Sequence, residues 1–101
     1  MFETRKLSKD EVVLAVDGPV TQENTAEFHR LMDELCSGPT MTVTLDLSKT
    51  PALNSSSLGK ILLFRKKLAE GQRVLQIRGC SENLFKTFQM IRFDSLISIV
   101  R

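Results

Sequence analysis

The segment Leu53–Leu62, LNSSSLGKIL, places four polar residues between a strand-like run and an apolar helical run. These residues, Asn54 and Ser55–Ser57, are all better suited to the N-cap of a helix than to its interior. One capping residue is enough to begin a helix, so capping accounts for one or two of the four. The remaining hydroxyl groups are therefore candidates for a function.

The start of a helix is a favourable place for a negative charge. The backbone N–H groups of the first turn have no partners inside the helix, and the helix dipole adds positive potential there. Such a position stabilises anions, including a phosphate group. The strand-like run MTVTLDL, Met41–Leu47, precedes this helix start, and α/β proteins usually carry their sites at the carboxyl ends of strands. The serines are consistent with plain helix capping or with a site for an anion.

Strand-like and helix-like patterns alternate on both sides of the serines. We expect strands at 3–7, 11–17, 41–47, 73–78 and 96–100, and helices that begin at Thr21, at the serines and at Ser81. The order strand-strand-helix-strand-helix-strand-helix-strand predicts an α/β fold with a mixed, mostly parallel sheet. Because the runs at 41–47 and 73–78 alternate apolar and polar side chains, we expect helices mainly on one face.

Each expected helix has an apolar stripe. In the first helix the stripe consists of Phe28, Leu31, Met32, Leu35 and Cys36, and in the last it consists of Leu84, Phe85, Phe88 and Ile91. For the helix after the serines we assign Leu58, Ile61, Leu62, Leu68 and Ala69 to the inner face, with Arg65 reaching outward past the sheet edge. Leu63 projects from the opposite face, among lysines. A single exposed leucine is common, and beside the serines it is also a candidate interface anchor.

The composition indicates one small domain. The chain has 101 residues, of which 42% are hydrophobic, so we expect a single domain spanning 1–101. No apolar run approaches the roughly 20 residues that a membrane helix requires. The N-terminal MFETRKLSKDE lacks the apolar core of a signal peptide, so we expect a cytoplasmic protein without membrane insertion. In that compartment Cys36 and Cys80 should be reduced thiols.

Several classes of function are disfavoured. Residues 1–50 carry a net charge of −4 and residues 51–101 a net charge of +6, but no basic block interleaved with aromatic residues points to nucleic acid. Two cysteines and His29, the only histidine, do not make a structural zinc site. An enzyme would need a base beside its nucleophile, whereas His29 lies on another helix without an orienting acid. We therefore expect no catalytic residue, no metal and no cofactor, since a Gly-rich phosphate loop is also missing.

The segment LDLSKTPALNSSSLGKILLFRKKL, Leu45–Leu68, resembles the core of STAS domains of the anti-sigma factor antagonist family. Members of that family show Asp-Leu-Ser at the end of a strand, a short loop, and then Asp-Ser-Ser-Gly-Leu-Gly before a helix. This chain has Asp46-Leu47-Ser48 and then Asn54-Ser55-Ser56-Ser57-Leu58-Gly59. VDGPVTQENTAEF resembles the family's Gly-x-Leu-Asp turn, and GQRVLQIRGCSENLFKTFQMIRFDSLISI resembles its last strand-helix-strand. The resemblance covers about residues 11–100.

The resemblance implies a STAS fold and a phosphorylation switch. In the family, the serine after the Asp is phosphorylated by an anti-sigma factor that is itself a serine kinase; here that residue is Ser55, with Ser56 as the alternative. In the family, the unmodified protein binds the kinase and frees a sigma factor. The phosphorylated protein dissociates from the kinase, and a phosphatase removes the phosphate. The implied partner-binding residues are Asn54, Ser55, Ser56, Ser57, Leu58, Lys60, Leu63 and Thr21. We expect a monomer.

The chain also departs from the family pattern. Asn54 replaces the usual Asp, Ser57 replaces a Gly, and Thr21 replaces the Asp of the Gly-x-Leu-Asp turn. The helix that many members carry after the last strand is missing, as it is in the STAS subunit of bacterial phospholipid transporters. A transporter subunit of that kind, or another partner-switching regulator outside sigma pathways, is therefore the alternative function.

Overall fold

The computed structural model describes residues 1–100. The elements follow one another as β1 (Phe2–Lys6), β2 (Glu11–Asp17), α1 (Thr25–Ser37), β3 (Thr42–Lys49), α2 (Ser55–Glu70), β4 (Val74–Arg78), α3 (Glu82–Met90), η1 (Phe93–Ser95) and β5 (Ser98–Val100). The predicted order of strands and helices is confirmed. The short 3₁₀ helix η1, which the sequence pattern did not predict, delays the last strand by two residues.

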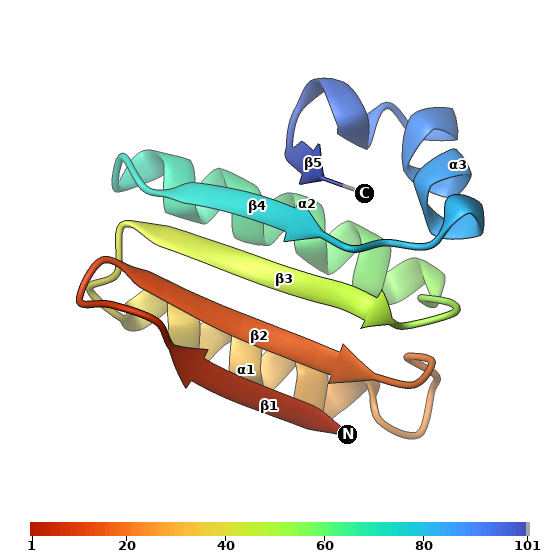
Figure 1. Ribbon diagram of the computed structural model, residues 1–101, viewed down its shortest axis with the longest axis horizontal. Helices are drawn as coiled ribbons and strands as arrows, with labels where there is room; N and C mark the ends of the chain where they lie inside the picture. Colours follow the sequence, from red (N-terminus) through yellow and green to blue (C-terminus); the bar gives the residue numbers. More distant parts are fainter. Residues whose placement is uncertain (101) are drawn as a thin grey trace.

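The strands form one mixed sheet in the order β1-β2-β3-β4-β5. β1 pairs with β2 in antiparallel orientation, and the other three pairings are parallel. Parallel neighbours require crossover connections, which α1, α2 and α3 provide. In Figure 1 the strands lie in front and α1 and α2 lie together behind them, so helices cover one face as predicted.

The core lies between the sheet and this helical layer. Alternate side chains of β3 and β4, including Val43, Leu45, Leu47 and Ile77, are buried against Phe28 and Met32 of α1 and Ile61, Phe64 and Leu68 of α2. Apolar residues recur every second position in the strands and every third or fourth position in the helices, and both sets face the same buried layer. This layer fixes α2 under β3 and β4 and places the serine segment at the carboxyl end of β3 (Figure 1).

The predicted start of the first helix is wrong. α1 begins at Thr25, with Asn24 at the N-cap position. Thr21 instead begins a separate turn, because its carbonyl oxygen accepts a hydrogen bond of 3.0 Å from the Thr25 N–H and its hydroxyl oxygen accepts one of 3.3 Å from the Glu23 N–H. The cap-competent side chain of Thr21 therefore satisfies a turn that precedes the helix.

The inner face of α2 also differs from the prediction. Phe64 is buried, whereas Leu62 is 39% exposed and Ala69 is exposed. Leu63 is 52% exposed, as predicted, and the Arg65 Nε reaches outward to donate a hydrogen bond of 3.0 Å to the Leu96 carbonyl. Ile61 and Leu68 are buried as predicted, and Leu58 packs partly buried against the core. Because apolar side chains occur on more than one side of α2, the periodicity alone included Leu62 and Ala69 and missed Phe64.

Two other boundaries are corrected. Met41 is 49% exposed and precedes β3, which continues to Lys49 instead of ending at Leu47. Ile91 is 43% exposed because α3 ends at Met90 and the chain turns at Arg92, which has a φ of 64°.

Candidate functional site

Asn54 caps α2. Its backbone is extended, with φ −75° and ψ 164°, and its side-chain Oδ1 accepts a hydrogen bond of 3.0 Å from the Ser57 N–H. The cap predicted from the sequence is therefore present without an aspartate charge. The first turn of α2 contains no acidic residue, so the positive potential at this helix start is not neutralised locally.

The three serines that follow have different surroundings. Ser55 is exposed, and within residues 1–100 its hydroxyl group makes no hydrogen bond. Ser56 is exposed as well, and its hydroxyl donates a long hydrogen bond of 3.4 Å to Asn54 Oδ1. Ser57 has no exposed surface. Hydroxyl groups that a partner can reach are therefore those of Ser55 and Ser56.

Ser57 joins α2 to α1. Its Oγ lies 3.0 Å from Thr25 Oγ1 and 3.3 Å from His29 Nε2, and Thr25 Oγ1 lies 3.2 Å from the same His29 nitrogen. Ser57 is one of the predicted partner-binding residues, but its side chain is buried in this structure, so it does not form part of the exposed surface. A hydroxyl group replaces the family's glycine here and finds its partners on the neighbouring helix.

Sequence spacing places no nucleophile beside His29, but the fold brings the Ser57 hydroxyl to 3.3 Å from its Nε2. Burial lowers the pKa of His29 below its ordinary value, and the positive charge of Lys60 lowers it further, against the opposing charge of Asp33. Asp33 itself is engaged by Lys60, whose Nζ lies 2.7 Å from its Oδ1. Nucleophilic catalysis requires an accessible nucleophile and an acid that orients the base. Ser57 is buried and Asp33 pairs with Lys60, so Ser57 and His29 meet neither requirement.

Thr21 is brought close to the serine segment by a backbone contact. Val20 and Leu53 form an isolated parallel bridge, and the Asn54 N–H donates a hydrogen bond of 3.2 Å to the Val20 carbonyl. The loop before α1 and the loop before α2 are therefore tied together at the carboxyl ends of β2 and β3. Leu63 lies eight residues along α2 from Ser55, which corresponds to about 12 Å of helix.

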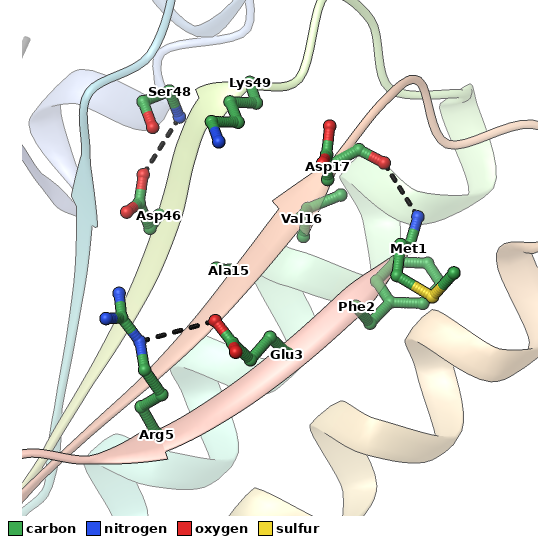
Figure 2. A pocket seen from close by; sticks show the side chains of 10 residues that line it. All are labelled: Met1, Phe2, Glu3, Arg5, Ala15, Val16, Asp17, Asp46, Ser48 and Lys49. Atoms are coloured by element: carbon green, nitrogen blue, oxygen red, sulfur yellow. Dashed lines mark hydrogen bonds and ion pairs between the residues drawn. The ribbon is translucent and has the colours of Figure 1, made fainter.

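The open face of the sheet carries a separate hollow of about 480 Å³ (Figure 2). Its wall includes an ion pair of 3.5 Å between Arg5 and Glu3, and Asp46, whose Oδ1 accepts a hydrogen bond of 3.0 Å from the Ser48 N–H. Partial burial acts to raise the pKa of Asp46, but the hydrogen bonds from Ser48 and the nearby arginine charges outweigh it, so the pKa lies below its ordinary value. This hollow carries charges of both signs, unlike the start of α2.

The described part of the chain offers neither a metal cluster nor a membrane span. Among residues 1–100 no three histidine, cysteine or acidic side chains gather closely enough to hold a metal ion. No helix in this described part of the chain has the length and apolar character needed to cross a membrane.

Comparison with known proteins assigns the family. Residues 4–100 match the family model described as "Mlab, STAS domain". The chain belongs to the STAS domain family. No curated protein matches it. The family assignment confirms the resemblance found around the serine segment, and the α/β fold with a mixed, mostly parallel sheet is the STAS fold.

Solved STAS structures share this fold at low sequence identity. The anti-sigma factor antagonist SpoIIAA in its unphosphorylated form has a TM-score of 0.84 and 15% identity, over 100% of this chain and 89% of that chain. An anti-sigma factor antagonist from Mycobacterium paratuberculosis has a TM-score of 0.88 and 12% identity, over 99% and 84%. The STAS domain of a SulP transporter from Vibrio cholerae has a TM-score of 0.73 and 14% identity, over 95% and 77%.

Proposed function

We propose that this STAS domain is an anti-sigma factor antagonist whose partner binding is switched by phosphorylation at Ser55. The unmodified protein binds an anti-sigma factor that is also a serine kinase, and a phosphatase restores it after phosphorylation. The observation that carries the proposal is the division of roles at the start of α2. Asn54 provides the cap, Ser57 is buried, and the Ser55 hydroxyl stays exposed beside unneutralised helix-terminal N–H groups.

The fold tolerates a phosphate at this position. Phosphorylation adds a charge of about −1.5 to −2 at neutral pH. On Ser55 that charge faces the positive end of the α2 dipole and no acidic side chain of the first turn. The phosphorylated domain therefore keeps its structure, and the switch acts at the interface.

The switch acts through the partner. A phosphate buried against a partner's surface loses its hydration and meets groups arranged for a neutral hydroxyl. A cost of about 3 to 4 kcal/mol weakens binding a few hundredfold, which is enough to change partners without a conformational change. Asn54, Ser56, Leu58, Lys60, Leu63 and Thr21 complete the proposed partner surface, and Ser56 is the alternative acceptor.

A second candidate is a STAS subunit of a membrane transporter, and the likeness to the SulP transporter domain of Vibrio cholerae supports it. In that role the polar residues at the start of α2 serve only as caps. The partner would then be a transporter protein, and binding would not depend on phosphorylation.

Affinity purification from the native cell separates the two candidates. Tagged wild-type protein, Ser55→Ala and Ser55→Asp are purified, and the proteins bound to each are quantified by mass spectrometry. We expect Ser55→Ala to retain a serine kinase in larger amount than wild type, and Ser55→Asp to retain it hundreds-fold less. Equal retention of a transporter component by all three would support the second candidate and contradict the first.

A further inference from the structure

The outer side of α2 carries a groove that the fold leaves uncovered. It measures about 430 Å³ and is lined by Gly59, Leu62, Leu63, Arg65 and Lys66. Both leucines are substantially exposed, at 39% and 52%. The Arg65 Nε is held by the Leu96 carbonyl at 3.0 Å, so one wall of the groove is fixed in place.

Gly59 is not required by the packing of this chain. A Cβ built at this position would meet nothing within 4 Å, and Gly59 has no positive φ that would exclude other residues. Glycine inside a helix is destabilising relative to alanine, so the position carries a cost with no benefit to the isolated fold. At Gly79, by contrast, a Cβ would lie 2.9 Å from the Ser48 Cβ, so the packing of the fold itself requires glycine there. Gly59 is explained if another backbone approaches α2 closely at this point.

The groove lies on the same side of α2 as Ser55, the proposed phosphorylation site. At 100° per residue, Ser55, Gly59, Leu62 and Lys66 lie on one side of α2, with Leu63 at its margin. From Ser55 to Lys66 they extend over about 16 Å of helix, which is the length of three turns of an opposing helix. A helix of that length that lies in the groove and continues toward the start of α2 therefore reaches the Ser55 hydroxyl.

The charge around the groove favours an acidic occupant. α2 carries four basic side chains and one acidic side chain, Glu70. Lys60 is paired with Asp33, whereas Arg65 and Lys66 form no ion pair within residues 1–100. Two unpaired cations beside two exposed leucines complement a segment that is both apolar and acidic.

We infer that this groove binds an acidic amphipathic helix of the protein partner, with its apolar face on Leu62 and Leu63 and its backbone against Gly59. The inference rests on the proposed function, since it names the part of the partner that docks beside Ser55. A protein helix is favoured over an anionic membrane because a lipid surface has no need of the close approach that Gly59 permits.

The test is site-specific photo-cross-linking in the native cell. The photoreactive residue p-benzoylphenylalanine replaces Leu63 in a Ser55→Ala background, and in a control it replaces Val74, which is also 52% exposed but lies on β4. We expect cross-linking at residue 63 to exceed that at residue 74 at least tenfold. The cross-linked partner peptide, identified by mass spectrometry, should be acidic, with apolar residues at helical spacing.

Two further variants test the groove itself. Gly59→Ala and Gly59→Leu should raise the urea midpoint of the free domain, because both residues favour helix. The same changes should progressively reduce the cross-link at residue 63, by at least tenfold for Gly59→Leu. A cross-link that persists in Gly59→Leu, or that joins a second copy of this chain, a lipid or a basic segment, would overturn the inference.

The experiments distinguish an error in the proposed groove binding from an error in the proposed phosphorylation switch. If the kinase co-purifies in a Ser55-dependent manner but residue 63 cross-links no more than residue 74, the proposed function stands and the groove assignment is wrong. If the Gly59-sensitive cross-link to an acidic helix forms equally with Ser55→Ala and Ser55→Asp, the groove stands and the phosphorylation switch is wrong.

Discussion

Ser57→Ala should destabilise the domain although the two serines before it tolerate the same change. The substitution removes a buried hydroxyl that lies 3.0 Å from Thr25 Oγ1 and 3.3 Å from His29 Nε2. Each hydrogen bond contributes about 1 kcal/mol. Alanine regains about 0.5 kcal/mol through its higher helix propensity. The free energy of unfolding should therefore fall by about 1.5 kcal/mol.

Urea unfolding followed by circular dichroism measures this loss. With a slope of about 1.5 kcal/mol per molar urea, the midpoint should fall by about 1 M. Ser55→Ala and Ser56→Ala are matched controls from the same helical turn, and their free energies of unfolding should stay within about 0.5 kcal/mol of wild type. Equal midpoints for the three variants would refute the assignment of Ser57 to the interhelical contact and of Ser55 to the surface.

Three other changes test the surroundings of the site. Burial lowers the pKa of His29, so the unfolded chain binds its proton more readily and stability should fall as pH drops from about 7.5 through the ordinary histidine value near 6.5 towards the lowered pKa. His29→Gln should abolish that slope in urea midpoints; an unchanged slope would contradict it. Arg73→Met should lower stability by about 3 kcal/mol, because its guanidinium binds the carbonyls of Leu35 and Cys36 in the last turn of α1 and of Thr40 in the loop that follows. The exposed Arg78→Met is the thermal-unfolding control, and similar melting temperatures would count against this role. Gly79→Ala should destabilise by about 1 to 3 kcal/mol, since Gly79 has a φ of 76° and a Cβ would contact Ser48; a midpoint equal to wild type would exclude this strain.

The order of elements followed from the sequence because local signals agreed along the chain. Strand alternation in MTVTLDL and RVLQIR, the caps at Asn54 and Ser81, and the stop at Gly71 each correspond to a feature of the structure. The sequence did not correctly predict which side of α2 faces the core. Leu62, Leu63 and Phe64 are consecutive apolar residues, and only the tertiary packing decides that Phe64 is buried and the leucines are exposed.

Only the local interactions of the site could be predicted from the sequence. Capping by Asn54 is a local interaction between residues three apart and could be read from the sequence. The contact of Ser57 with His29 joins residues 28 apart on two helices, and no spacing rule connects them. A serine at a glycine position of the family motif was the available signal, because an added hydroxyl at a buried helix start needs a partner nearby.

The switch at Ser55 is tested by phosphosite mapping of the protein isolated from its own cells. We expect phosphate on Ser55 in part of the population, with the kinase partner bound only to the unmodified part. Phosphate on Ser56 alone would move the acceptor by one residue. Absence of phosphate under every growth condition, with Ser55→Asp binding the partner as tightly as wild type, would contradict the switch and return the start of α2 to helix capping.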